Sequence, residues 1–164
     1  MNEKDKTELQ KAAKSLDESS KLKREQAEQS NLKSITEEKK AKNNFKNLQQ
    51  EVILPFVDEL ETIFKTTSVS LSYMTNEHLK NVQAVIQNFI QINFHVKRGN
   101  KVYGNTPNIK FDLNPHQNKI RITKMIDITK GEILDEEYLA DELGKSHIVD
   151  FLNIFVKECV AYYE

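Results

Sequence analysis

The sequence predicts an α+β protein with a long N-terminal helix, a small antiparallel β-meander of three to four strands, and a C-terminal helix packed on the sheet. Residues 1–98 contain no glycine and a single proline, Pro55, whereas all four glycines lie in residues 99–144. Because these two residue types interrupt regular structure, the chain has a helical front and a turn-rich back. Apolar spacing of three or four in the front and strict alternation in the back give the same division.

The length and the distribution of charge favour one compact domain with an appendage. The chain has 164 residues, of which 30% are charged, and residues 1–50 carry twelve Lys or Arg and nine Asp or Glu. A chain of this length fits a single domain. We therefore predict a charged arm over residues 1–36, helical or disordered, and a compact domain over residues 37–164 that opens with a helical segment, 37–65.

The arm has a sparse apolar pattern. Leu9 and Leu16 are one heptad apart, but Lys23, Ser30 and Glu37 hold the next positions in that register. Such a broken heptad is compatible with a coiled coil. It is equally compatible with a segment that is disordered alone and becomes helical on a partner.

The segment 37–65 has an apolar stripe at steps of three or four residues, which places its members on one face of a helix. The stripe consists of Ala41, Phe45, Leu48, Val52, Phe56, Leu60 and Ile63. Pro55 lies inside it, and a proline in a helix removes a backbone hydrogen bond and clashes with the carbonyl four residues back. We expect either a kink near residues 51–54 or a new helix that starts at Pro55.

Residues 66–89 allow two interpretations at their start. Val69, Leu71 and Tyr73 alternate with serines, as in a half-buried strand, and a loop that crosses between helices is the alternative. Asn76 is a suitable N-cap for a short amphipathic helix that extends to Phe89.

The back half has the alternation of an antiparallel meander. Apolar residues alternate with polar ones over 90–96, 109–113 and 120–123, and a short return strand starts at 102–103. The predicted turns are Gly99-Asn100 and the segment 114–118. This arrangement sets Asp112 opposite Arg121 on paired strands.

The C-terminal helix, from an N-cap at Ser146, is apolar nearly all round. One stripe contains Ile148, Phe151, Leu152, Phe155 and Cys159, and most of the remaining circumference contains Val149, Ile154, Val156, Val160 and Tyr163. A helix of this kind is buried on more than one side. The second cover is either the N-terminal helices of the same chain or the helix of a second chain.

No catalytic, cofactor or metal motif is found in the sequence. There is no glycine-rich phosphate loop, HExxH or GxSxG, and Gly144-Lys145-Ser146 is interpreted as a helix-capping turn. We therefore expect no catalytic residues, no cofactor and no metal. The acidic residues at 135–142 are interpreted as the solvated face of a helix whose Tyr138 and Leu139 point inward. A third functional hypothesis is an enzyme that uses these carboxylates together with one of the four separated histidines.

The leading functional hypothesis is a non-enzymatic interaction or assembly protein, a small subunit or homodimer that uses helical surfaces. It rests on the charged arm, the over-apolar last helix and the lack of a catalytic motif. The expected interface residues are Phe45, Leu48, Val52, Phe56, Leu60, Val149, Val156, Val160 and Tyr163.

The alternative is a nucleic-acid-binding protein that uses the basic 97–101 hairpin and the arm. Its expected contact residues are Lys97, Arg98, Lys101, Tyr103 and Arg121, extended along the exposed sheet face by Lys110, Lys119 and Lys124. No apolar run approaches the ~20 residues that span a bilayer. With a single cysteine and no secretory signal, we expect a cytoplasmic protein without a membrane partner.

Overall fold

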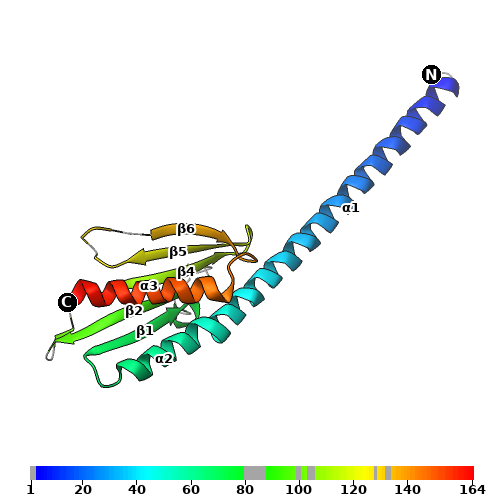
Figure 1. The fold of residues 1–164 in the computed structure, drawn as a ribbon. Helices are drawn as coiled ribbons and strands as arrows, with labels where there is room; N and C mark the ends of the chain where they lie inside the picture. Colours follow the sequence, from blue (N-terminus) through cyan, green and yellow to red (C-terminus); the bar gives the residue numbers. More distant parts are fainter. Residues whose placement is uncertain (1–2, 80–87, 99–100, 103–105, 128, 132–133) are drawn as a thin grey trace. The chain divides into compact units, whose positions relative to one another are not determined.

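The computed structural model describes residues 3–79, 88–98, 101–102, 106–127, 129–131 and 134–164. The chain divides into two compact units, Met1–Glu37 and Glu38–Glu164. The first unit is helical, and all its described side chains are exposed. The second unit contains an antiparallel sheet and the C-terminal helix, so the predicted α+β class with a long N-terminal helix is confirmed (Figure 1).

The N-terminal helical segment continues past Pro55 by means of a widened turn. Helix α1 (Glu3–Leu48) is followed directly by a π-helical turn, η1 (Gln49–Ile53), and by helix α2 (Leu54–Phe64). Pro55 therefore lies in the first turn of α2, where a missing N–H costs little. The irregularity falls where the kink was predicted, but it is a π turn within a continuous helical segment.

The sheet is antiparallel throughout, with the order β1-β2-β4-β5-β6, and the two-residue β3 pairs with β2 beside this path. The strands are β1 (Val69–Thr75), β2 (Asn88–Arg98), β3 (Lys101–Val102), β4 (Asn108–Asn114), β5 (Lys119–Met125) and β6 (Leu134–Leu139). Five main strands replace the predicted three to four. Residues 69–75 form a strand, which decides between the two interpretations of that segment.

The two faces of the sheet differ in what covers them. On one face, apolar side chains such as Phe94, Phe111 and Ile122 are fully buried in one core with residues of α2 and α3. We call this the covered face; Figure 1 shows α3 lying across it. On the opposite side, here the open face, the alternate residues of β4 and β5 are polar apart from Met125, among them Lys110 and Arg121. Phe89 of β2 also lies on this side and is buried, with Lys110 Nζ 4.9 Å from its ring centroid.

Helix α3 (Lys145–Tyr163) buries its predicted stripe against the sheet. Four of the five stripe residues are buried, and Phe151 is half-buried. The second cover is partly intramolecular, since Ile53 and Val57 of η1 and α2 share this core. The N-cap is Gly144 rather than Ser146, and the Gly144 N–H donates to His147 Nδ1 at 3.3 Å. The predicted capping turn is therefore present, but the helix is capped by Gly144, two residues before the expected N-cap Ser146.

Two further sequence interpretations need correction. The acidic segment at residue 135 is strand β6 and not a helix, and its Leu139 is exposed rather than inward. The helix predicted from Asn76 to Phe89 begins as a 3-10 helix, η2 (Asn76–Leu79), but Phe89 belongs to β2. Residues 80–87 between them, and Gly99-Asn100 of the predicted hairpin turn, lie outside the described residues.

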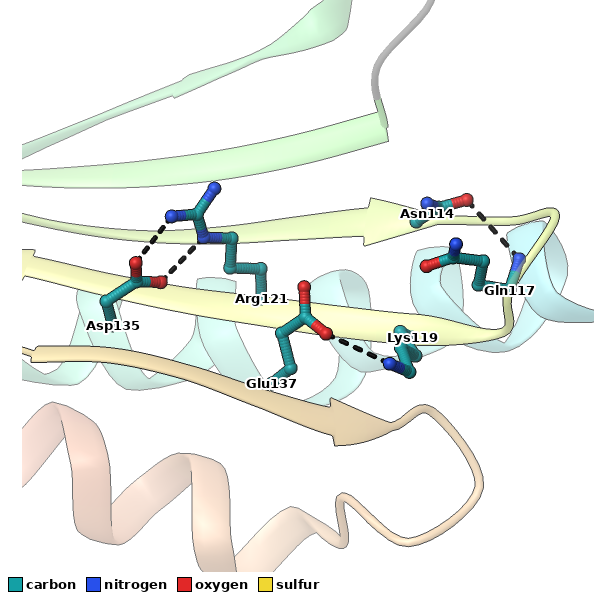
Figure 2. A network of polar contacts seen from close by, with 6 residues as sticks. All are labelled: Asn114, Gln117, Lys119, Arg121, Asp135 and Glu137. Atoms are coloured by element: carbon teal, nitrogen blue, oxygen red, sulfur yellow. Dashed lines mark hydrogen bonds and ion pairs between the residues drawn. The ribbon is translucent and has the colours of Figure 1, made fainter.

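The turn predicted at 114–118 joins β4 to β5. Asn118 has a φ of 52°, a conformation that asparagine tolerates better than most residues. The Gln117 N–H donates to Asn114 Oδ1 at 3.3 Å (Figure 2). On the other side of the turn, His116 Nδ1 lies 2.8 Å from Glu38 Oε1 of α1.

Candidate functional site

An apolar groove lies between the π turn with α2 on one side and α3 on the other. Its volume is about 560 Å³. The apolar lining consists of Val52, Pro55, Phe56, Leu60, Ile63 and Val149, and the polar lining of Glu51, Glu59, Lys145 and Asn153. Four of the predicted interface residues, Val52, Phe56, Leu60 and Val149, thus come together in one place.

The π turn explains why Phe56 and Leu60 line the groove and are only half-buried. Before the turn, Ala41 and Phe45 of the predicted stripe are buried. From the last residue of the turn onward, Ile53 and Val57 are the deepest residues, each one position later than the stripe predicts. A π turn contains one more residue than an α turn, and each residue rotates a helix by about 100°. The buried face therefore moves along the sequence by one residue.

The same shift turns the second half of the stripe outward. Phe56 and Leu60 are half-buried, and Ile63 is 60% exposed. These are large apolar side chains at helical spacing, which in an uninterrupted α-helix would lie on the same face as Phe45. Ile63 belongs to the predicted stripe but not to the expected interface residues; its exposure follows from the extra residue in η1.

The rim of the groove is charged, and one of its walls is acidic. Lys145 Nζ lies 2.8 Å from Glu51 Oε2, which joins the first turn of α3 to the π turn. Of the α2 carboxylates, Glu59 lines the groove, and Asp58 and Glu61 lie on the same helix outside the lining; α2 has no basic residue. The local negative charge of this wall favours a basic partner.

The remaining predicted interface residues lie elsewhere in the second unit. Phe45 is buried in the protein's own core, and Leu48 and Val156 pack partly against it. Val160 and Tyr163 line a smaller hollow of about 210 Å³ beside β1 and β2. There the Tyr163 ring stacks on Phe94, with a centroid distance of 6.2 Å.

The basic residues proposed for nucleic acid are only partly described. Lys97 is exposed, and the β2–β3 pairing sets Arg98 opposite Lys101; the side chains of these two residues and the whole of Tyr103 lie outside the described part of the chain.

On the open face, the cations of β5 lie beside carboxylates of β6 (Figure 2). Arg121 Nε and Nη2 contact Asp135 at 2.6 and 2.5 Å, and Lys119 Nζ lies 3.1 Å from Glu137. These carboxylates offset the positive charge that a phosphate backbone would meet.

Asp112 lies opposite Arg121, as predicted, and its Oδ2 is 2.7 Å from Lys110 Nζ. Lys124 does not extend the basic surface as predicted. It is on the covered face, where its Nζ lies 2.5 Å from Glu158 Oε2 of α3. The alternation of β5 gives Lys124 the same side as Ile120 and Ile122, which explains the burial.

Cys159 and His95, two potentially reactive side chains, lie in different parts of the fold, in α3 and in β2. Burial raises the pKa of the Cys159 thiol, so this side chain remains a protonated core residue. His95 Nε2 lies 2.7 Å from Ser72 Oγ on the open face, and His147 lies in the first turn of α3. Among the described residues, no group of three His, Cys, Asp or Glu is placed to hold a metal ion.

Comparisons with known proteins add no functional assignment: no family model, curated protein or solved structure matches the chain. Within the described part of the chain, no helix is long and apolar enough to cross a membrane. The groove between α2 and α3 is therefore the candidate site, on its own geometry.

Proposed function

We propose that the chain is a non-enzymatic assembly protein that binds a partner helix in the groove between α2 and α3. The observation that carries the proposal is the outward orientation of Phe56, Leu60 and Ile63 along one wall of the groove. Apolar grooves between helices accept the apolar face of an amphipathic helix. Such a function needs neither a cofactor nor a metal.

The occupant that the charges favour is the arm of a second copy of this chain. The arm has exposed leucines, including Leu22 and Leu32, that the first unit does not cover. Leu22 is flanked by Lys21, Lys23 and Arg24, which complement the acidic wall of α2. Reciprocal exchange of two arms gives a closed dimer with twofold symmetry.

The proposal places this homodimer in the cytoplasm as a small subunit of a larger assembly. The single cysteine supports a reducing compartment, because it leaves no disulfide to form within the chain. The arm is a helix that gains its stability from the partner's groove, as a coiled-coil segment does from its neighbour.

The test is the native molar mass, measured by light scattering after gel filtration at low and moderate salt. We expect twice 19.1 kDa for the unaltered chain. Ile63→Glu adds a carboxylate to an apolar and already acidic wall, so we expect a shift to the monomer mass. Reversal of charge at Lys21, Lys23 and Arg24 tests the second half of the interface, and we expect the same shift.

Ile154→Glu is the matched control. Ile154 is 49% exposed on α3 and does not line the groove, so the same substitution there leaves the dimer intact. A monomer at every protein concentration, or equal effects of Ile63→Glu and Ile154→Glu, contradicts the proposal. Salt-sensitive binding of nucleic acid that weakens on Lys97→Glu favours the alternative function instead.

A further inference from the structure

A second cavity, distinct from the groove, lies where the end of α1 and the start of η1 meet the C-terminal end of β1 and η2. Its volume is about 440 Å³. This is within the range of small-molecule sites, about 300–1,000 Å³. Its lining is mainly polar, which separates it chemically from the apolar groove.

The cationic part of this cavity comes from two lysines one helical turn apart. Lys42 and Lys46 both line it, and the spacing of four puts them on the same face of α1. Glu77 is the one carboxylate of the described lining. The cavity therefore has a local excess of positive charge.

A histidine adds a directed donor to the two ammonium groups. His78 Nδ1 accepts a hydrogen bond from the Thr75 N–H at 3.0 Å. In the neutral ring this assigns the proton to Nε2, so that Nε2–H is the donor of this side chain. The lysines and the histidine are the donor types that bind phosphate.

An aromatic ring lines the same cavity. Tyr73 is exposed, and it meets the His78 ring edge to face, with a centroid distance of 5.9 Å. A tyrosine face stacks on planar heterocycles. Gln49, the first residue of the π turn, also lines the cavity, and π turns are frequent at functional sites.

We propose that this cavity binds a small molecule that combines a phosphate group with a planar ring, the chemistry of a mononucleotide. Lys42, Lys46 and His78 hold the phosphate, and Tyr73 stacks on the ring. The inference does not depend on the groove or on dimerisation.

The test is calorimetric titration of the full chain with AMP, adenosine and inorganic phosphate. We expect saturable binding of AMP that is tighter than that of either fragment. Replacing Lys42 and Lys46 by glutamine removes two charge-assisted contacts, so AMP affinity falls by about tenfold or more. Tyr73→Leu lowers the affinity for AMP and leaves that for inorganic phosphate unchanged.

The matched control replaces Lys39 and Lys40 by glutamine. These two lysines belong to the same helix and carry the same charge, but they do not line the cavity. We expect AMP affinity to change by about twofold or less, since only long-range charge is removed. Equal losses in the two double variants, or no saturable binding at millimolar AMP, overturns the proposal.

Discussion

The two faces of the sheet show what burial demands of a side chain. On the covered face, β4 contributes Ile109, Phe111 and Leu113, all buried among the residues of the helices. On the open face, the alternate residues of the same strand are Lys110 and Asp112, joined by an ion pair of 2.7 Å. Successive side chains of a strand point to opposite faces of the sheet. One strand therefore contributes apolar side chains to the core and charged side chains to the open face.

The ion pairs of the two faces differ in how far water reaches them. The Arg121–Asp135 pair on the open face has both side chains about half exposed. Lys124, the one charged residue of the covered face that the structure describes as buried, has a side chain only 8% exposed. Water screens the first pair and hardly reaches the lysine of the second.

The largest expected effect is on the covered face. Phe111→Ala removes a fully buried ring from the centre of the core. We expect a loss of about 3–5 kcal/mol in the free energy of unfolding, measured by urea denaturation with circular dichroism. Thr123→Ala, on the open face, is the control and changes stability by about 0.5 kcal/mol or less. Similar losses in the free energy of unfolding for both variants would contradict the expected difference between the two faces.

An intermediate effect is expected at the ion pair of the covered face, and it is asymmetric. Glu158→Ala leaves the Lys124 ammonium buried without its partner, which costs about 1–3 kcal/mol. Lys124→Met leaves Glu158, whose side chain is 42% exposed although its Oε2 is buried, so we expect a smaller loss than for Glu158→Ala. Urea denaturation of both variants measures the asymmetry, and equal losses contradict it.

The smallest effect is expected on the open face and is seen best as a titration. Hydrogen bonding from Arg121 lowers the pKa of Asp135 below its ordinary value of 3.8. A lowered pKa means that the pair's stabilising contribution is present above pH 3.8 and is lost as the pH falls through the lowered pKa. In Arg121→Ala the pKa of Asp135, followed by NMR, returns toward 3.8, and high salt produces part of the same shift. An unchanged pKa contradicts the contact.

Most of the fold follows from periodicity in the sequence. Strict alternation marks β2, β4 and β5 because each has one face in the core, and Asn114 to Asn118 mark the turn between two of them. Strand β6 was missed for a physical reason. It is an edge strand, where charged residues such as Asp135 and Glu137 oppose further pairing, so Tyr138 is its only β-branched or aromatic residue.

The candidate site was predictable in composition but not in position. The spacing of Phe56 and Leu60 identifies them as members of an apolar helical face. Pro55 signals an irregularity, but tertiary packing decides whether it becomes a kink, a break or a widened turn. Only the widened turn sends Ile53 and Val57 into the core in place of Val52 and Phe56 as its deepest residues.

The apolar wall of the groove depends on the number of residues in the π turn. Deleting one residue from Gln49–Ile53 restores uniform helical spacing and rotates α2 by about 100° about its axis. Phe56 and Leu60 then point at the sheet, and the groove loses its apolar wall without any change in the side chains of α2. A single inserted residue is therefore enough to turn an apolar helical face from the interior toward a groove.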